Sequence, residues 1–227
     1  MGQPDAKMTD VFRDINVVCF DVFDTLIEIT DRRRPFVPLK RRMGLEKAHR
    51  FRQLAMTTDM TWAEINAEIA GGATITDLEQ AQIAIAREVA SVRIRPGVAE
   101  MLAALPIRYG VCSNLSADYV GALDRFPEIS PAFRVLSCFV GCMKPDRRIY
   151  EMVLEAAGTS AGRILFVGDT PTADIDGPTR AGMRVMHIND LIAALTGGGS
   201  GPSRPDPFAR AFRAARGSIS KDLDIES

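Results

Sequence analysis

Five short apolar runs alternate with helical patterns along most of this chain, and this alternation constrains the fold more than any other feature. The runs cover residues 16–20, 107–112, 134–139, 163–167 and 184–188. Between the later runs, apolar residues recur at helical spacing over residues 96–105, 146–157 and 173–182. Strands that alternate with helices at this spacing are typical of a doubly wound parallel sheet. The pattern therefore predicts an α/β fold with three layers, α/β/α, around a Rossmann-like parallel sheet.

Residues 28–92 differ from the rest of the chain because they lack a strand-like run and contain several helix-like segments. These segments cover residues 38–56, 60–70 and 76–92. A helical insertion directly after the first strand would lie over the carboxyl edge of the sheet, where it could exclude water and contact a substrate. We therefore expect an α/β core built from residues 1–27 and 93–195, with 28–92 as a helical cap.

The composition changes after about residue 195, where glycine and serine dominate a short stretch. This stretch is typical of a flexible linker. Residues 207–216 have the pattern of a basic helix with Phe208 and Phe212 on one face, which would either dock on the domain or belong to a disordered tail. We assign residues 196–227 to a linker and a C-terminal tail.

Charge and cysteine content exclude several classes of function. The chain has 227 residues and a formal net charge of −1, so charge gives no basis for binding nucleic acid or a membrane surface. No apolar run approaches membrane-spanning length, and residues 1–14 lack an apolar signal core. The four cysteines lack CxxC spacing, which favours buried free thiols in a reducing compartment. We expect a cytoplasmic protein with no nucleic-acid partner and no membrane partner.

Polar clusters follow the predicted strands at the points where those strands end. They are Asp21 with Thr25, Ser113-Asn114, Lys144, and Gly168-Asp169 followed by Asp174. Each cluster taken alone is typical of a turn or a helix cap. The carboxyl ends of parallel strands, however, meet at one edge of a sheet, which is where open α/β sheets place their ligands. The four clusters together therefore predict one assembled site.

Four segments of the chain carry a resemblance to a known family. They are FDVFDTL (20–26), VCSN (111–114), GCMKPDRRIYEMVLEAAG (141–158) and FVGDTPTADIDGPTRAGM (166–183). With these motifs the chain resembles the haloacid dehalogenase superfamily of phosphatases and related hydrolases. The resemblance covers the whole predicted core, and it implies a hydrolase, in the first place a phosphatase acting on a small phosphorylated metabolite.

The resemblance also implies a role for the polar residues at the first three strand ends. Asp21 would be the nucleophile, attacking phosphorus to form an aspartyl-phosphate. Lys144 would pair with Asp21 and with the negative charge that develops on the phosphoryl group. Ser113 would donate a hydrogen bond to a phosphoryl oxygen, and Thr25 and Asn114 are further candidate substrate-binding residues.

A magnesium ion is the cofactor that the resemblance implies, held by Asp21, Asp169 and Asp174. The electrostatics agree with this, because three carboxylates in one crevice repel one another unless a cation lies among them. A hard dication with oxygen ligands provides that cation and also neutralises the phosphate. Lys144 would add one more positive charge.

The first motif departs from the phosphatase pattern. Phosphatases of this superfamily typically have Asp-x-Asp there, with the second Asp as general acid and base, whereas this chain has Phe23 at that position and Asp24 one residue later. Neighbouring side chains of an extended segment point to opposite sides, so Asp24 is a candidate acid–base residue but not a simple replacement for an acid at position 23. The superfamily's 2-haloacid dehalogenases carry an aromatic residue at this position and need no metal, but the acid pair Asp169 and Asp174 favours the phosphatase. A non-catalytic regulatory protein with the same fold is the third alternative.

Two features of residues 28–92 bear on the substrate. The segments Asp31-Arg32-Arg33-Arg34 and Lys40-Arg41-Arg42 form the densest basic patch of the chain. This patch is either a solvated helix face or a source of one or two arginines that bind a substrate anion. Trp62 has apolar neighbours at helical spacing, which predicts that it packs in the core of the insert.

Overall fold

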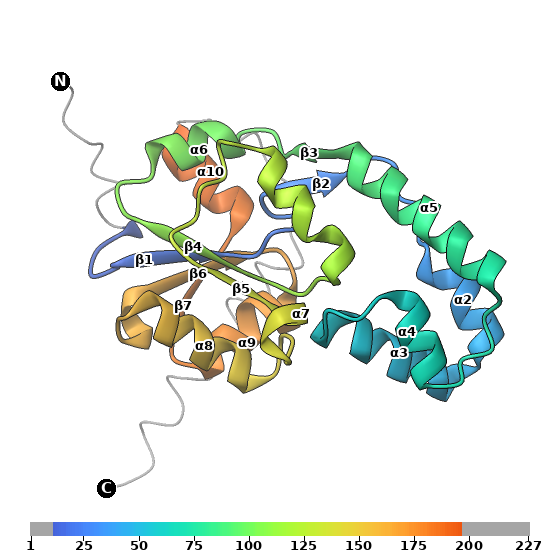
Figure 1. The fold of residues 1–227 in the computed structure, drawn as a ribbon. Coiled ribbons are helices and arrows are strands. Elements are labelled where there is room, and N and C mark those ends of the chain that lie inside the picture. Colours follow the sequence, from blue (N-terminus) through green and yellow to red (C-terminus); the bar gives the residue numbers. More distant parts are fainter. Residues whose placement is uncertain (1–10, 197–227) are drawn as a thin grey trace, which may run out of the picture.

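A parallel sheet of five strands forms the centre of the computed structural model, which describes residues 11–196 (Figure 1). In chain order the strands are β1 (Val17–Phe20), β4 (Tyr109–Ser113), β5 (Arg134–Leu136), β6 (Ile164–Gly168) and β7 (Arg184–His187). Across the sheet their order is β5-β4-β1-β6-β7, so β1 is central and Val18 lies between Tyr109 and Leu165. This arrangement confirms the predicted doubly wound α/β fold.

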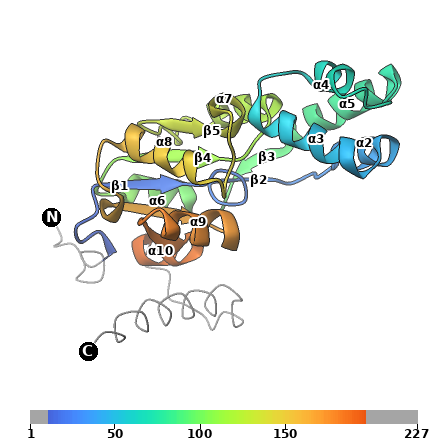
Figure 2. The same ribbon diagram turned by 90° about the horizontal axis from the view of Figure 1, so that it is seen from below.

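Helices cover both faces of the sheet (Figures 1 and 2). Helices α6 (Val98–Ala104) and α10 (Ile188–Thr196) and the 3₁₀ helix η1 (Ala117–Arg125) pack on one face, and α8 (Arg147–Ala157) packs on the other. Side chains of β1 alternate between the two cores: Val18 and Phe20 join the first, and Val17 and Cys19 join the second. Both faces of β1 are therefore buried, as its continuous apolar run requires.

Residues 36–91 form a helical insert with a hydrophobic cluster of its own. Its helices are α2 (Phe36–Met43), α3 (Leu45–Thr57), α4 (Trp62–Glu68) and α5 (Ile75–Ser91). The single helix that the sequence predicts over residues 38–56 is interrupted at Gly44, which has a φ of 76° and separates α2 from α3. Such a positive φ suits glycine, because a side chain with a Cβ atom is strained there.

The insert is attached to the core through a two-stranded antiparallel sheet that the sequence pattern did not predict. Strand β2 (Ile27–Ile29) pairs with β3 (Val92–Ile94), and Ile27 lies opposite Ile94. The expectation that residues 28–92 contain no strand was therefore wrong at both ends of the range. Each strand has three residues, which is too short for an alternating pattern to be visible in the sequence.

The segment after β6 also differs from its prediction. In place of one helix over residues 173–182, the chain forms a π-helical turn, η3 (Pro171–Asp176), followed by α9 (Gly177–Arg180). Pro171 and Pro178 have no backbone N–H to donate, which favours short irregular turns over one regular helix. The remaining short helices are α7 (Ser137–Val140) and η2 (Ala161–Arg163), so the predicted run 134–139 is a strand only in its first half.

Two further properties of the fold concern its cysteines and the hydropathy of its helices. All four cysteines are free and buried. Within residues 11–196, none of the helices has the length and apolar character needed to cross a membrane. The linker and basic helix predicted beyond residue 196 lie outside the described residues, as do residues 1–10.

Candidate active site

Asp21 lies directly after the central strand, with its side chain buried at the carboxyl edge of the sheet. Its backbone N–H donates to the carbonyl of Val167 at 2.8 Å, which extends the pairing of β1 with β6 by one residue. Thr25 donates to Oδ2 of Asp21 at 3.2 Å, and Ser113, at the end of β4, donates to Oδ1 at 3.3 Å. Both hydroxyl residues are buried, so three predicted site residues meet here.

Lys144 connects two of the predicted carboxylates. Its Nζ lies 2.7 Å from Oδ1 of Asp21 and 2.7 Å from Oδ1 of Asp174, and its side chain is only 2% exposed. Asn114 fixes the backbone of this lysine: the Lys144 N–H donates to Oδ1 of Asn114 at 2.7 Å, and Nδ2 of Asn114 donates to the Lys144 carbonyl at 2.8 Å. The amide of Asn114 therefore holds the loop that carries the lysine.

Burial and charge act in opposite directions on the titration of this group of residues. Burial disfavours the charge on Lys144, but the carboxylates of Asp21 and Asp174 outweigh it and raise the pKa of the ammonium group well above its usual range. Burial also raises the pKa of Asp21, with the Lys144 charge opposing the increase and the Asp174 charge adding to it. Lys144 thus stays protonated at neutral pH.

Asp169 and Asp174 complete a cluster of three acids with Asp21. Each offers one carboxylate oxygen such that the three atoms lie within 4.8 Å of one another. Asp174 is held by the backbone N–H of Thr170, which donates to its Oδ2 at 3.0 Å. Gly168 leaves room for this side chain, since a Cβ atom there would lie 2.5 Å from Cγ of Asp174. Burial and the nearby charges of Asp21 and Asp24 raise the pKa of Asp169.

The donor set of this cluster fits a hard divalent cation. All of the candidate ligand atoms are carboxylate oxygens, which Mg²⁺ prefers in proteins. Three carboxylates against one ammonium group leave two negative charges in a largely buried site, and one divalent ion would balance them. The residues that would hold the ion are Asp21, Asp169 and Asp174.

The side chains of Phe23 and Asp24 have different contact partners. Phe23 packs edge-on against Tyr119, with ring centroids 5.8 Å apart and an interplanar angle of 90°. Asp24 has a φ of 63°, and its carboxylate forms an ion pair with Arg32 in which both side chains are nearly half exposed. A positive φ at a non-glycine residue re-aims the side chain. The role of Asp24 as an acid–base residue thus remains a prediction, and in this structure its carboxylate is engaged by Arg32.

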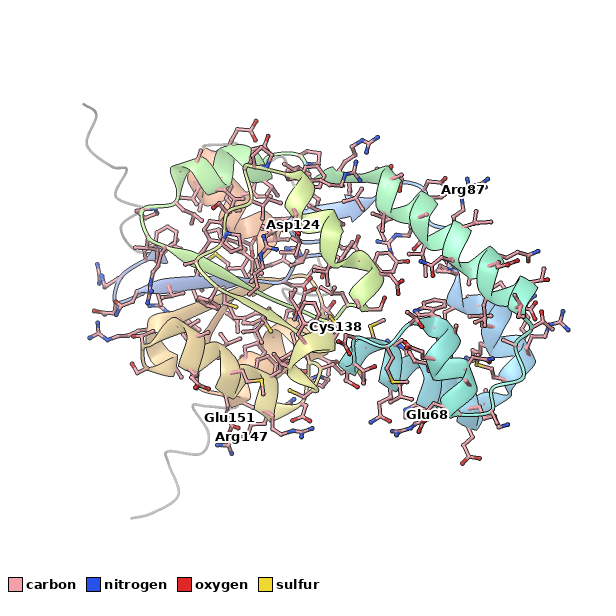
Figure 3. All side chains as sticks on the ribbon, viewed as in Figure 1. Glu68, Arg87, Asp124, Cys138, Arg147 and Glu151 are labelled. Atoms are coloured by element: carbon pink, nitrogen blue, oxygen red, sulfur yellow. The ribbon has the colours of Figure 1, made fainter. Side chains whose placement is uncertain are left out.

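A cavity of about 310 Å³ is lined by residues that follow β1 and β4, among them Phe23 and Asn114, and by residues of the insert. We call it the Phe23 cavity; the residues that matter most in its lining are Phe23, Arg32, Arg34, Trp62, Glu88 and Tyr119. Figure 3 shows side chains filling the region where the insert meets the core, with Cys138 of α7 on the side that faces α3 and α4. Helix α3 packs against α7 there.

Sequence reasoning did not single out Glu88 or Tyr119. Glu88 is 5% exposed although it lies on a helix of the insert, and Tyr119 lies on η1 of the core. Tyr119 donates its hydroxyl to Oε2 of Glu88, and burial together with this carboxylate raises the pKa of the phenol. Because the two residues are 31 positions apart and belong to different helices, no local pattern could have paired them.

Part of this chain is similar to a curated protein. The chain is 41% identical over 56 residues to the pyrimidine 5'-nucleotidase YjjG of Escherichia coli (strain K12). The aligned part covers 24% of this chain and 25% of the relative, so the match spans about a quarter of that relative's length.

Solved structures share the fold over most of the chain. The HAD family enzyme bt-2542 of Bacteroides thetaiotaomicron superposes with a TM-score of 0.57 at 19% identity, covering 87% of this chain and 98% of that one. Its complex with magnesium and inorganic phosphate gives a TM-score of 0.54 at 18% identity, with 76% and 93% covered. A 2-haloacid dehalogenase from Pseudomonas syringae pv. Tomato DC3000 gives 0.50 at 21% identity, with 85% and 92% covered.

The family itself follows from a match that covers most of the motifs described above. A model of the haloacid dehalogenase-like hydrolases matches residues 15–182. This range contains the whole insert and the carboxyl ends of β1, β4, β5 and β6. Asp21, Ser113, Lys144 and the two acids after β6 all lie inside this range. This chain belongs to the haloacid dehalogenase-like hydrolase family.

Proposed function

We propose that this hydrolase is a Mg²⁺-dependent phosphatase that acts on a small phosphorylated metabolite. The observation that carries the proposal is the cluster of three carboxylates around one buried lysine. Such a set suits an anionic nucleophile that must approach an anionic phosphate, because the cations around it offset the repulsion. The complex of the fold relative with magnesium and inorganic phosphate supports the same assignment.

In the proposed reaction an oxygen of Asp21 attacks phosphorus, a P–O bond to the aspartate forms, and the P–O bond to the leaving group breaks. The leaving oxygen takes a proton, and water then cleaves the aspartyl-phosphate to release inorganic phosphate and regenerate the carboxylate. Lys144 offsets the charge that develops, and Ser113 and Thr25 donate hydrogen bonds at the attacking group. A bound Mg²⁺ would supply further charge neutralisation.

Asp24 is the proposed source and acceptor of protons, and the insert is the proposed cap. For Asp24 to reach the leaving group, its ion pair with Arg32 has to open. A substrate phosphate competes for the same guanidinium, since arginine binds phosphate and carboxylate in a similar bidentate way. The insert contacts the core at α7 and borders the Phe23 cavity, a position from which it would exclude water during the reaction.

Dehalogenation is the second candidate, and Phe23 is the observation that favours it. An aromatic side chain borders the cavity at the position where phosphatases of this superfamily typically have a second acid. An aspartate that attacks carbon needs no Mg²⁺, whereas the acids Asp169 and Asp174 beside Asp21 would then lack a compensating cation. We therefore favour phosphoryl transfer.

A direct comparison of substrates tests the proposal. We expect the protein to release phosphate from p-nitrophenyl phosphate with Mg²⁺ present, and to lose this activity when EDTA removes the metal. We expect no halide release from 2-chloropropionate under either condition. Halide release without metal would instead support the dehalogenase, and absence of both activities over a wider panel of phosphate esters would support the non-catalytic alternative.

Metal binding gives a prediction that does not depend on turnover. Asp169→Ala is expected to weaken Mg²⁺ binding by at least about tenfold, since even the partners of metal ligands contribute that much to affinity. Isothermal titration calorimetry measures the change. The matched control is Asp176→Asn, an exposed acid of the same segment outside the cluster, which should bind Mg²⁺ like the unchanged protein. Equal affinities for all three proteins would contradict the metal site.

A further inference from the structure

We propose that the Phe23 cavity selects phosphate esters whose organic group carries a planar ring with carbonyl oxygens. This inference rests on the proposed phosphatase function, because it names the substrate class of the same site. The lining of the cavity includes Phe23, which is two residues after the proposed nucleophile Asp21 in the chain. The volume of about 310 Å³ is in the range of small-molecule sites. A phosphate at Asp21 would place the attached organic group in or beside this space.

The walls of the cavity suit a flat ring. Phe23 and Tyr119 meet edge-on on the core side, as described above, and on the insert side Phe36 meets Trp62 with centroids 6.5 Å apart and an interplanar angle of 85°. All four aromatic side chains line the cavity. Aromatic rings prefer offset-stacked or edge-to-face contacts with other rings, so four such walls favour a planar group over a flexible chain.

Hydrogen-bond donors are available around the Phe23 cavity. Within residues 11–196, the guanidinium of Arg34 has no hydrogen-bond or ion-pair partner. Arg32 uses part of its guanidinium on Asp24 and has further N–H groups, since arginine carries five. Trp62 is 7% exposed, and its indole Nε1–H is the one buried side-chain N or O atom of the described residues without a partner.

The carboxylate and amide oxygens that line the cavity are already engaged. Oε1 of Glu88 accepts from the backbone N–H of Arg33 at 2.6 Å and of Arg34 at 2.7 Å, and Oε2 accepts from Tyr119. Oδ1 of Asn114 accepts from the backbone of Lys144. The hydroxyl of Ser116 donates to Asp118 at 3.4 Å and is a side-chain oxygen of the lining that still has room to accept, whereas two guanidinium groups and an indole can donate. The cavity therefore matches ring carbonyls better than a ring amino group. A buried polar group without a partner is costly.

Two nucleotides that differ along one edge of the ring test this directly. Uridine 5′-monophosphate has a carbonyl at C4 beside an N3–H, whereas cytidine 5′-monophosphate has an amino group at C4 beside an unprotonated N3, and ribose 5-phosphate has no ring base. With Mg²⁺ present, we expect kcat/KM for the uridine ester to exceed that of both others by about tenfold or more. Arg34→Met should bring the ratio of uridine to cytidine ester towards one. Arg87→Met, an exposed arginine of α5 that does not line the cavity (Figure 3), should leave the ratio unchanged. Equal kcat/KM values for the two nucleotides, or an Arg34→Met variant that keeps the preference, would overturn the proposal.

Fluorescence separates a failure of this inference from a failure of the phosphatase assignment. Trp62 is the single tryptophan of the chain and lines the Phe23 cavity, so its emission responds to a ligand that binds there. With EDTA present, so that Mg²⁺-dependent hydrolysis is stopped, titration with uridine 5′-monophosphate should give a saturable change in emission, and ribose 5-phosphate should give none. If no ester is hydrolysed with Mg²⁺ but this change is seen, the phosphatase assignment fails, and the proposal that the Phe23 cavity binds a planar ring stands. If hydrolysis occurs and the emission never changes, the proposal that the Phe23 cavity binds a planar ring is refuted.

Discussion

Replacing Asp21 with Asn is expected to lower kcat by at least about 10⁴-fold while the protein keeps its fold, because the proposed nucleophile is lost and little else changes. Asn has the same shape as Asp, and its remaining carbonyl oxygen can still accept the hydrogen bonds that Lys144 and Ser113 donate to Oδ1. Removing one of the two carboxylates next to Lys144 leaves Asp174 at 2.7 Å to balance its charge. Phosphate release in steady state measures the loss, and thermal unfolding verifies the fold.

The control for this experiment is an acid on the surface. Asp124→Asn removes a carboxylate that pairs with Arg134 at 2.6 Å in an exposed position (Figure 3), where ion pairs contribute little. Its activity should match the unchanged protein. An Asp21→Asn variant that keeps more than about a hundredth of the activity would instead assign the reaction to another group, since loss of a general acid or base alone has effects of that order.

The polar residues of the candidate site could be placed together from the sequence alone. Asp21, Ser113, Lys144 and Asp174 are far apart in the chain, and the structure brings them into hydrogen-bond contact. This proximity was predictable because each follows an apolar run, and parallel strands bring their carboxyl ends to one edge. The same logic extends to the fold class, which depends on the order and spacing of the runs rather than on any single residue.

Other features depend on contacts and backbone angles that no local pattern specifies. Asp24 has a positive φ of 63°, which takes it out of the alternation of an extended strand, and Phe23 packs against Tyr119 of η1. Strands β2 and β3 become visible only when the two ends of the insert pair with each other. The contact of Glu88 with Tyr119 exists because the insert packs back on η1. The strand pairing and the two contacts with Tyr119 are tertiary events, and Phe23, Glu88 and Tyr119 all line the Phe23 cavity.

Lys144 gives the largest expected effect on stability. Lys144→Met keeps much of the side-chain volume but leaves Asp21 and Asp174 buried without a counter-charge, and breaking a buried pair in this way costs about 3–5 kcal/mol of unfolding free energy. Urea unfolding near neutral pH measures the loss. The control Lys40→Met, at an exposed position of α2, should stay within about 0.5 kcal/mol of the unchanged protein.

The pH dependence of this loss identifies its cause. In the unchanged protein the raised pKa of Lys144 contributes stability that is complete below the ordinary lysine value of about 10.4 and is lost only at more alkaline pH. In the variant, Asp21 loses the Lys144 charge that opposes the increase in its pKa, so its folded-state pKa should rise further above the ordinary value of about 3.9. Protonation of Asp21 then relieves the repulsion, so the stability difference should shrink as the pH falls through this folded-state pKa, and Mg²⁺ should restore part of it at neutral pH. A loss of the same size at every pH and metal concentration would instead mean that Lys144 stabilises the fold through packing alone.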